Sequence, residues 1–149
     1  MLIVGIDPGV SGGIACLSPD GAEAEPMPLV GKEIDAGYLA DWLITRSPAL
    51  VVVEKVGAMP GNGAVSMFKF GTGFGQILGV LEALKLSHYR VTPQAWKKAV
   101  LAGTSRDKTA AVEYVHRRYP DVCLTPGRKR TPHDGMADAL CLAEYGRTL

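Results

Sequence analysis

Apolar residues near the start of the chain fall in short runs separated by turn-forming residues. Residues 2–6 form one largely apolar run, which ends at Asp7, and residues 14–17 form a second. The proline and glycines at 8–13 predict a tight turn between the two runs. Each run fits a buried strand, and a weaker, more acidic strand near 24–29 would extend the pair into an antiparallel meander.

The next apolar positions follow the spacing of a helix. Between residues 34 and 43 they recur three or four residues apart, and Pro48 limits how far this helix can extend. Residues 50–53 are apolar without alternation, which indicates a strand buried on both faces, as in the centre of a parallel sheet. This strand ends at Glu54.

A long segment rich in glycine, methionine and phenylalanine follows at residues 55–70. It shows no clear period, and a connection of that length is usually functional. Residues 71–86 have helical periodicity, with small residues at every fourth position: Gly71, Gly75, Gly79 and Ala83. Because glycine disfavours a helix by up to about 1 kcal/mol per residue, another backbone should approach this face. That backbone would belong either to the chain's own sheet or to a second copy of the chain, and we expect the dimer.

The second half of the chain alternates one strand with three helices. Residues 89–91 fit a fifth strand, and the threonine and proline at 92–93 are a good helix start, with threonine as the cap. Residues 104–118 open with a capping box and predict a second helix. A basic, proline-containing loop at 121–133 leads to a last helix at 134–145.

Composition limits the class of protein. The 149 residues, 47% of them hydrophobic, can bury the core of one compact domain, and the order of elements predicts an α/β domain over residues 1–149. No apolar run approaches the roughly 20 residues of a membrane span, and the N-terminus lacks the pattern of a signal peptide. Three scattered cysteines, Cys16, Cys123 and Cys141, favour a reducing cytoplasm over a disulfide framework or a zinc site.

Charge is distributed unevenly along the chain, although the net charge is only +1. The balance is −4 over residues 1–86, +7 over residues 87–133 and −2 over the remainder. A basic central segment is expected of a protein that binds a polyanion, and a solvated helical surface explains the same charges equally well. The basic residues of the segment are Arg90, Lys97, Lys98, Arg106, Lys108, Arg117, Arg118, Arg128, Lys129 and Arg130.

Acidic residues follow the two best strands. Asp7 and Glu54 each stand at the carboxyl end of a strand, where open α/β sheets bind their ligands. If these strands are parallel neighbours, roughly 4.7–4.9 Å apart, the carboxylates converge and require a cation or a raised pKa. Asp134 and Asp138, four residues apart, share one face of the last helix. Interaction with the helix dipole, worth about 0.3–1 kcal/mol, also explains Asp134, but explains Asp138 less well.

These four carboxylates come from three separated segments, and no cysteine or histidine cluster accompanies them. Such a set of hard oxygen donors suits Mg²⁺ or Mn²⁺. Sites of this kind hold two ions roughly 3.5–4 Å apart, one to activate water and one to stabilise the leaving oxygen of a phosphodiester. The acids and the basic segment therefore predict the same polyanionic substrate.

Five short motifs run through most of the chain. They are Gly5-Ile6-Asp7-Pro8-Gly9-Val10-Ser11-Gly12-Gly13, Val52-Val53-Glu54, Thr92-Pro93-Gln94-Ala95-Trp96-Lys97, Asp107-Lys108 and His133-Asp134-Gly135-Met136-Ala137-Asp138-Ala139-Leu140. In this order they resemble the motifs of the RuvC-type Holliday junction resolvases. The first and last are the most specific, and the last is most similar to phage-type and organellar members.

The resemblance implies an RNase H-like fold, with a five-stranded mixed sheet flanked by helices. It implies a homodimeric endonuclease of DNA recombination and repair that nicks two strands of a four-way junction symmetrically, leaving 5′-phosphate and 3′-hydroxyl ends. Asp7, Glu54, Asp134 and Asp138 would hold two Mg²⁺ or Mn²⁺ ions, without a nucleotide cofactor or a membrane. Lys108 matches a basic residue that contacts phosphate near the cut. The protein would act in a bacterial or phage-infected cytoplasm, or in an organellar matrix.

Two features differ from the bacterial members of that family. Those members space the last two acids by three residues, whereas Asp134 and Asp138 are four apart. They also carry an aromatic wedge soon after the second acid, where residues 55–59 contain no aromatic. Phe68 or Phe70 would take that role by stacking on an unpaired base, unless both belong to the core.

Further assignments follow from charge and position. Residues expected to contact DNA phosphate, which adds affinity without reading sequence, are Lys55, Lys69, Lys97, Lys98, Arg106, Arg128, Lys129 and Arg130. His133 is either a proton-transfer group beside the metals or a solvated loop residue.

Three alternative functions remain open. Asp-x-Gly turns also cradle phosphate in the actin and sugar-kinase group, although those proteins use two such domains and longer chains. A non-catalytic junction-binding subunit could keep the fold, but the presence of all four acids argues against it. The nuclease could also act on RNA–DNA hybrids or on other branched DNA.

Overall fold

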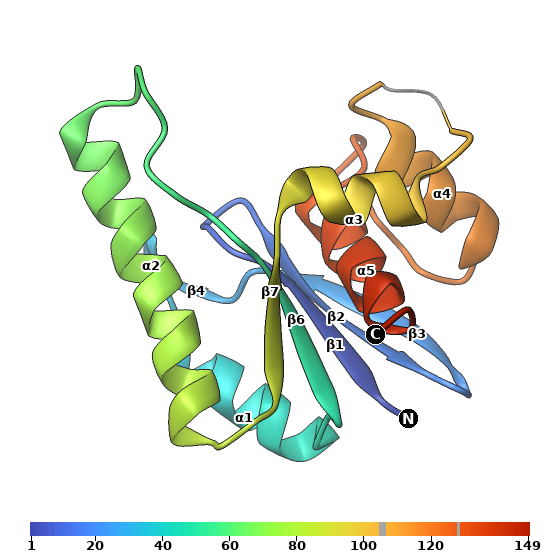
Figure 1. The fold of residues 1–149 in the computed structure, drawn as a ribbon, viewed down its shortest axis with the longest axis horizontal. Helices are drawn as coiled ribbons and strands as arrows, with labels where there is room; N and C mark the ends of the chain where they lie inside the picture. The colour runs from blue at the N-terminus through green and yellow to red at the C-terminus, as the bar shows by residue number, and fades with distance from the viewer. Residues whose placement is uncertain (105–106, 128) are drawn as a thin grey trace.

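The computed structural model describes residues 1–104, 107–127 and 129–149. A five-stranded sheet runs through its centre in the order β3-β2-β1-β6-β7 (Figure 1). Strands β1, β2 and β3 form the predicted antiparallel meander, and β1, β6 and β7 pair in parallel. The strands are β1 (Ile3–Asp7), β2 (Gly13–Ser18), β3 (Gly21–Pro26), β6 (Leu50–Glu54) and β7 (His88–Val91). The predicted mixed sheet is confirmed.

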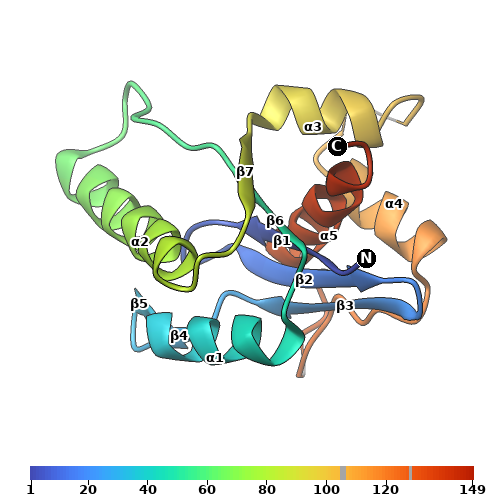
Figure 2. The same cartoon turned by 60° about the horizontal axis from the view of Figure 1, so that its bottom comes forward.

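Helices cover both faces of this sheet (Figure 2). α1 and α2 lie against one face, and α5 lies against the other, with α3 and α4 packed beside it. The helices are α1 (Ala36–Arg46), α2 (Ala64–Ala83), α3 (Pro93–Val100), α4 (Ala110–Arg118) and α5 (Asp134–Gly146). A small hairpin that the sequence did not predict, β4 (Leu29–Val30) and β5 (Glu33–Ile34), stands apart from the main sheet.

Alternation along the strands divides the core in two. In β1, Ile3 contributes to the core under α5, whereas Val4 and Ile6 contribute to the core under α1 and α2. The run Val51–Val53 is fully buried, because β6 lies between two strands and beneath helices on both faces. This is the environment that its uninterrupted apolar sequence predicts.

Helix α5 lies in backbone contact with the sheet. A Cβ atom added to Gly5 would stand 1.9 Å from the carbonyl oxygen of Ala139, and one added to Gly135 would stand 2.4 Å from that of Ser11. No side chain fits at either position, so glycine is required for helix and strand to approach this closely. The contact fixes the height of α5 above β1.

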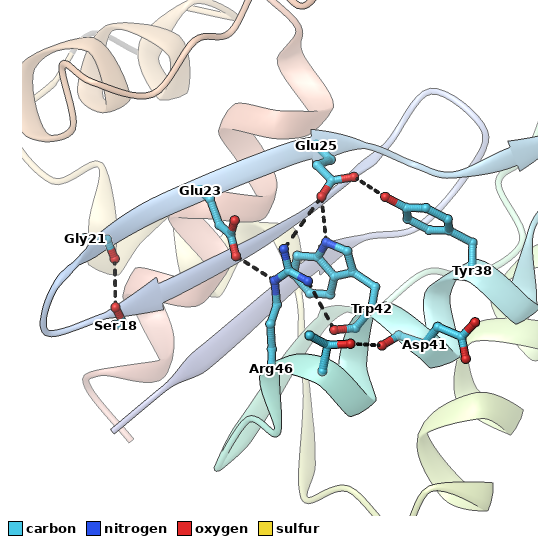
Figure 3. A network of polar contacts seen from close by, with 9 residues as sticks. Ser18, Gly21, Glu23, Glu25, Tyr38, Asp41, Trp42 and Arg46 are labelled. Atoms are coloured by element: carbon cyan, nitrogen blue, oxygen red, sulfur yellow. Dashed lines mark hydrogen bonds and ion pairs between the residues drawn. The ribbon is translucent and has the colours of Figure 1, made fainter.

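On the opposite face, a polar network attaches α1 to the edge strand β3 (Figure 3). The indole Nε1 of Trp42 donates to Glu25 at 2.7 Å, and the Tyr38 hydroxyl donates to the same carboxylate at 2.9 Å. The Arg46 guanidinium pairs with Glu23 at 2.5 Å and lies 3.8 Å from the centre of the Trp42 ring. These bonds stabilise the edge of the sheet, two strands away from β1 and on the face opposite α5.

Two helix starts differ from the predictions. α2 begins at Ala64 rather than at residue 71, because partly buried Met67 and Phe70 extend its helical spacing toward the N-terminus. Phe68 and its neighbours therefore lie on a helix and not in a loop. α4 begins at Ala110, later than the capping box predicted, and two residues of that box lie outside the described part of the chain.

Most residues of α2 are not buried by the rest of the described chain. Its buried residues are Gly73, Ile77 and Leu81, whereas Val65 is 70% and Phe68 77% exposed. Among the described residues, α2 is also the one helix long and apolar enough to cross a membrane, with a mean hydropathy of 1.2 and 17% of the tested window buried. Length and composition alone are weak support for a membrane span, but they show how apolar this uncovered helix is.

The small-residue face of α2 does not pack on the chain's own sheet. Cβ atoms added to Gly71, Gly75 and Gly79 would have no described atom within 4 Å. The first interpretation of this face, packing on the sheet, is therefore wrong. The face is open to a partner.

Candidate active site

Two carboxylates stand side by side at the carboxyl ends of the central strands. β1 and β6 are parallel neighbours, and their register pairs Ile6 with Val53. Asp7 and Glu54 are the next residues, so they lie level on strands roughly 4.7–4.9 Å apart. This is the convergence that the sequence predicted.

Helix α5 brings a third carboxylate to the same place. Asp138 immediately precedes Ala139, whose carbonyl oxygen lies against Gly5 of β1. Both Asp138 and Glu54 raise the pKa of Asp7, so the three side chains interact across the strand ends. Asp134, one turn earlier, is exposed and interacts with Asp138. The structure thus brings together three of the four predicted acids, with Asp134 at their margin.

The charged forms of two of these acids are disfavoured. Burial is the main reason why the pKa of Asp7 is raised to about 8, and the charges of Asp138 and Glu54 add to it. Burial likewise raises the pKa of Asp138 to about 6, to which Glu54 and Asp134 contribute. The ammonium of Lys97 opposes both shifts. Lys97, predicted only as a DNA contact, therefore lies within electrostatic reach of the acids.

A divalent cation fits the chemistry of this set. Within residues 1–104, 107–127 and 129–149, no three Asp, Glu, His or Cys side chains are gathered closely enough to hold an ion as they stand. The carboxylates nevertheless interact, and a cation among them would offset both their repulsion and their burial. Holding an ion would require their side chains to turn toward a common point.

Glu54 has a partner that the sequence did not reveal. Trp96, fully buried in α3, donates from Nε1 to Glu54 Oε2 at 2.7 Å. The two residues are 42 positions apart. In the sequence, the two residues share only one feature, a place at or just after the end of a parallel strand. That feature is too general to predict a contact between them.

A cleft of about 730 Å³ opens beside the acids. It lies between α3, the segment before α4 and the start of α5. Its charged lining residues are Lys97, Lys98, Asp107, Lys108, Asp134 and Asp138. Three basic side chains and two of the predicted metal-binding acids thus line one hollow, which suits a phosphate backbone passing the carboxylates.

The contacts of His133, Phe68 and Phe70 bear on two alternatives that the sequence left open. His133 caps α5, where its Nδ1 accepts from the Met136 amide at 3.1 Å, so Nε2 is the nitrogen that could transfer a proton. Burial and then Lys129 lower the pKa of His133. Phe70 lies against Gly9, whereas Phe68 is exposed on α2.

The remaining basic residues are mostly on the surface. Lys55, Lys69, Lys129 and Arg130 are exposed, as expected for phosphate contacts. Lys55 and Lys69 flank the β6–α2 connection, and the other two precede α5. Arg106 and Arg128 lie outside the described residues.

Comparison with solved structures matches nearly the whole chain. It superposes on RuvC of T. thermophilus in complex with Holliday junction substrate with a TM-score of 0.69 and 21% identity, covering 99% of this chain and 96% of that one. The chain has the fold of the RuvC resolvases. Fowlpox virus resolvase, solved with Holliday junction DNA, gives a TM-score of 0.58 at 14% identity, covering 99% of both chains. The yeast mitochondrial Holliday junction resolvase Ydc2 gives 0.55 at 14% identity, covering 95% of this chain and 75% of that one.

The RuvC fold confirms the predicted RNase H-like architecture and sheet topology. No protein-family model and no curated protein sequence matches the chain. At these identities the likeness concerns the fold, so the roles of individual residues rest on the geometry described above.

Proposed function

We propose that the protein is a structure-selective endodeoxyribonuclease that resolves four-way DNA junctions by paired, symmetric nicks. The observation that carries the proposal is the meeting of Asp7, Glu54 and Asp138 at one edge of the sheet, beside a basic cleft. Its fold is shared with resolvases solved with junction DNA.

Asp7, Glu54, Asp134 and Asp138 would hold two Mg²⁺ or Mn²⁺ ions. Bound there, the ions would supply an activated water and neutralise charge on the phosphodiester, giving 5′-phosphate and 3′-hydroxyl ends. The protein's own contribution is to gather the carboxylates at one place and to hold the phosphate beside them. Lys97, within reach of the acids, would favour their charged forms.

The basic side chains would guide the DNA backbone through the cleft. Lys98 and Lys108 line it, so they would contact phosphates next to the cut. Lys129 and Arg130, just before α5, would extend this contact along the strand. Phe68, 77% exposed beyond the β6–α2 connection, would stack on a base at the branch point.

Paired nicks require two sites in one particle, and α2 offers the surface for a dimer. Its exposed glycines allow the backbones of two helices to approach closely, which would bury apolar residues such as Val65. A dimer would also cover the helix whose composition alone could suit a membrane. We therefore propose a homodimer with α2 at its seam.

Cleavage of three labelled substrates tests the proposal: an immobile four-way junction, a linear duplex and an RNA–DNA hybrid, each with and without Mg²⁺. Symmetric nicks in the junction alone, dependent on Mg²⁺, are expected. Asp7→Asn should lower the cleavage rate by roughly 1,000-fold, because loss of one ion would remove several kcal/mol of transition-state stabilisation. The same variant should still bind the junction. Preferential cleavage of the hybrid, or cutting that survives in Asp7→Asn, would overturn the assignment.

A further inference from the structure

The indole of Trp96 ties α3 to the carboxyl end of β6. The side chain is 0% exposed, and its Nε1 lies 2.7 Å from Glu54 Oε2. An indole N–H can only donate a hydrogen bond, so the carboxylate oxygen is the acceptor. A half-buried carboxylate that is bonded to a buried, rigid ring has little freedom to rotate.

The backbone sets this contact. β7 runs parallel to β6 with Val91 opposite Glu54, and Thr92 then caps α3 through its bond to the Ala95 amide. Trp96 follows on the first turn of a helix whose start is fixed at the strand end. The ammonium of Lys97 lies 5.3 Å from the centre of its ring, so the indole also borders the cation nearest the acids.

We propose that Trp96 is a positioning residue for the metal-binding site, an inference that rests on the proposed function. The indole holds Oε2 of Glu54 and thereby presents Oε1 toward Asp7 and the ion. Partners that orient a metal ligand in this way typically change metal affinity by about 10–100-fold. Trp96 would act through Glu54 and would not touch the DNA.

The chain contains a matched control in Trp42. Its indole is also buried, 4% exposed, and also donates to a glutamate, Glu25, at 2.7 Å. That bond attaches α1 to β3 on the opposite side of the sheet. Trp42→Phe and Trp96→Phe therefore remove the same ring and the same kind of hydrogen bond, but only the second removes it from a predicted metal ligand.

Mn²⁺ binding to each variant without DNA, measured from the electron paramagnetic resonance signal of free Mn²⁺, separates the two roles. Trp96→Phe should weaken Mn²⁺ binding at least about tenfold, whereas Trp42→Phe should leave it unchanged. Urea unfolding of both variants measures the stability cost that they share. In a Glu54→Ala background the effect of Trp96→Phe should disappear, because no side-chain oxygen at position 54 is left to accept the hydrogen bond.

Nitrogen-15 spectra of the intact protein test the same point without relying on a Trp96 variant that folds. Trp42→Phe assigns the two indole N–H signals. Mg²⁺ should move the Trp96 signal and leave the Trp42 signal in place, and Glu54→Gln should do likewise. A Trp96 indole N–H signal whose chemical shift does not change at saturating Mg²⁺ would refute the proposal.

The outcomes distinguish this inference from the proposed function. A wild-type protein that binds no Mn²⁺ overturns the metal-dependent nuclease and the role of Trp96 together. A wild-type protein that binds Mn²⁺, with unchanged affinity in Trp96→Phe, overturns the positioning role alone. Equal losses of affinity in both tryptophan variants mean a structural effect and also contradict the role.

Discussion

At the scale of single residues, the half-buried position of Asp7 would couple proton release to binding of the proposed metal ions. Its pKa is about 8 and that of Asp138 about 6, both above the usual carboxyl value of 3.8. A divalent ion can bind these oxygens only when the protons leave. Affinity for Mg²⁺ should therefore increase from about pH 6 to about pH 8, while protons are released.

The same shift predicts how the stability of the metal-free protein depends on pH. Between about pH 4 and pH 8 the folded state holds a proton on Asp7 that the unfolded chain has released, so the free energy of unfolding falls as pH rises. At about 1.4 kcal/mol per pKa unit, the loss is on the order of several kcal/mol. Urea unfolding in EDTA at pH 5 and pH 8 measures it. Asp7→Asn should remove most of this difference in unfolding free energy. An Asp7→Asn variant that loses as much stability between pH 5 and pH 8 as the wild type would contradict Asp7 as the cause.

Individual side-chain contacts are the part of the site that the sequence could not predict. The position of Asp7 and Glu54 at strand ends was readable, because apolar runs define where strands stop. The Trp96–Glu54 bond was not, because it depends on a rotamer and on two segments 42 residues apart. The choice between Phe68 and Phe70 needed the structure for the same reason, since only contacts show which ring is exposed.

At the scale of elements, the backbone contact between α5 and β1 sets the place of Asp138. Gly5→Ala puts a Cβ 1.9 Å from the Ala139 carbonyl oxygen, and backbone cannot turn aside as a side chain can. Overpacking typically lowers the free energy of unfolding by about 1–3 kcal/mol. For a protein of this size, each kcal/mol lowers the melting temperature by about 2–4 °C. We expect a lower melting temperature and a loss of cleavage. Gly57→Ala, in open space on the β6–α2 connection, should change neither.

The exposed face of α2 carries the second prediction at this scale. Gly75→Leu meets no described atom of its own chain, so the monomer should fold, but the added side chain would hold two α2 helices apart. Sedimentation should give twice the monomer mass for the wild type and a reduced mass for the variant. Asp41→Leu, at an exposed position of α1, controls for the added apolar surface. A wild-type monomer that still makes paired nicks would refute the seam.

Element boundaries were predictable where periods were clean. The strands other than β3, and α5, follow the apolar runs or helical spacing closely and lie where the sequence predicted them. The third strand begins at Gly21, three residues before the predicted start near 24, because its mixed acidic sequence gives a weak pattern. The start of α2 was missed because residues 64–70 were grouped with the glycine-containing connection before them, so the partly buried Met67 and Phe70 were not assigned to the helix. The β4–β5 hairpin, two residues per strand, is too short to leave a period.

At the scale of the whole molecule, the basic central segment lies beside the acids and not on a separate surface. It supplies α3 and the region before α4, which line the cleft, and the loop that leads into α5. Binding of DNA should therefore weaken steeply with salt. Replacing Lys129 and Arg130 by Gln should reduce the slope of log affinity against log salt by up to about 2, at about 0.9 per phosphate contact.

Fluorescence anisotropy of a labelled junction over a range of salt concentrations measures this slope. Lys32→Gln with Lys85→Gln, two exposed lysines of the acidic first segment, removes the same charge and should leave the slope nearly unchanged. Equal slopes for both double variants would mean that the protein attracts DNA by net charge and not through phosphate contacts of Lys129 and Arg130.

The place of α5 in the chain order has a consequence for biosynthesis. This helix closes one core and contacts β1, β2, β3 and β6, yet the ribosome makes it after all of them. Until it has emerged from the exit tunnel, Gly5 of β1 is uncovered, and Asp7 and Glu54 lack their third partner. A nascent chain should therefore be both unfolded and harmless to nearby DNA, and acquire structure and cutting activity in the same late step.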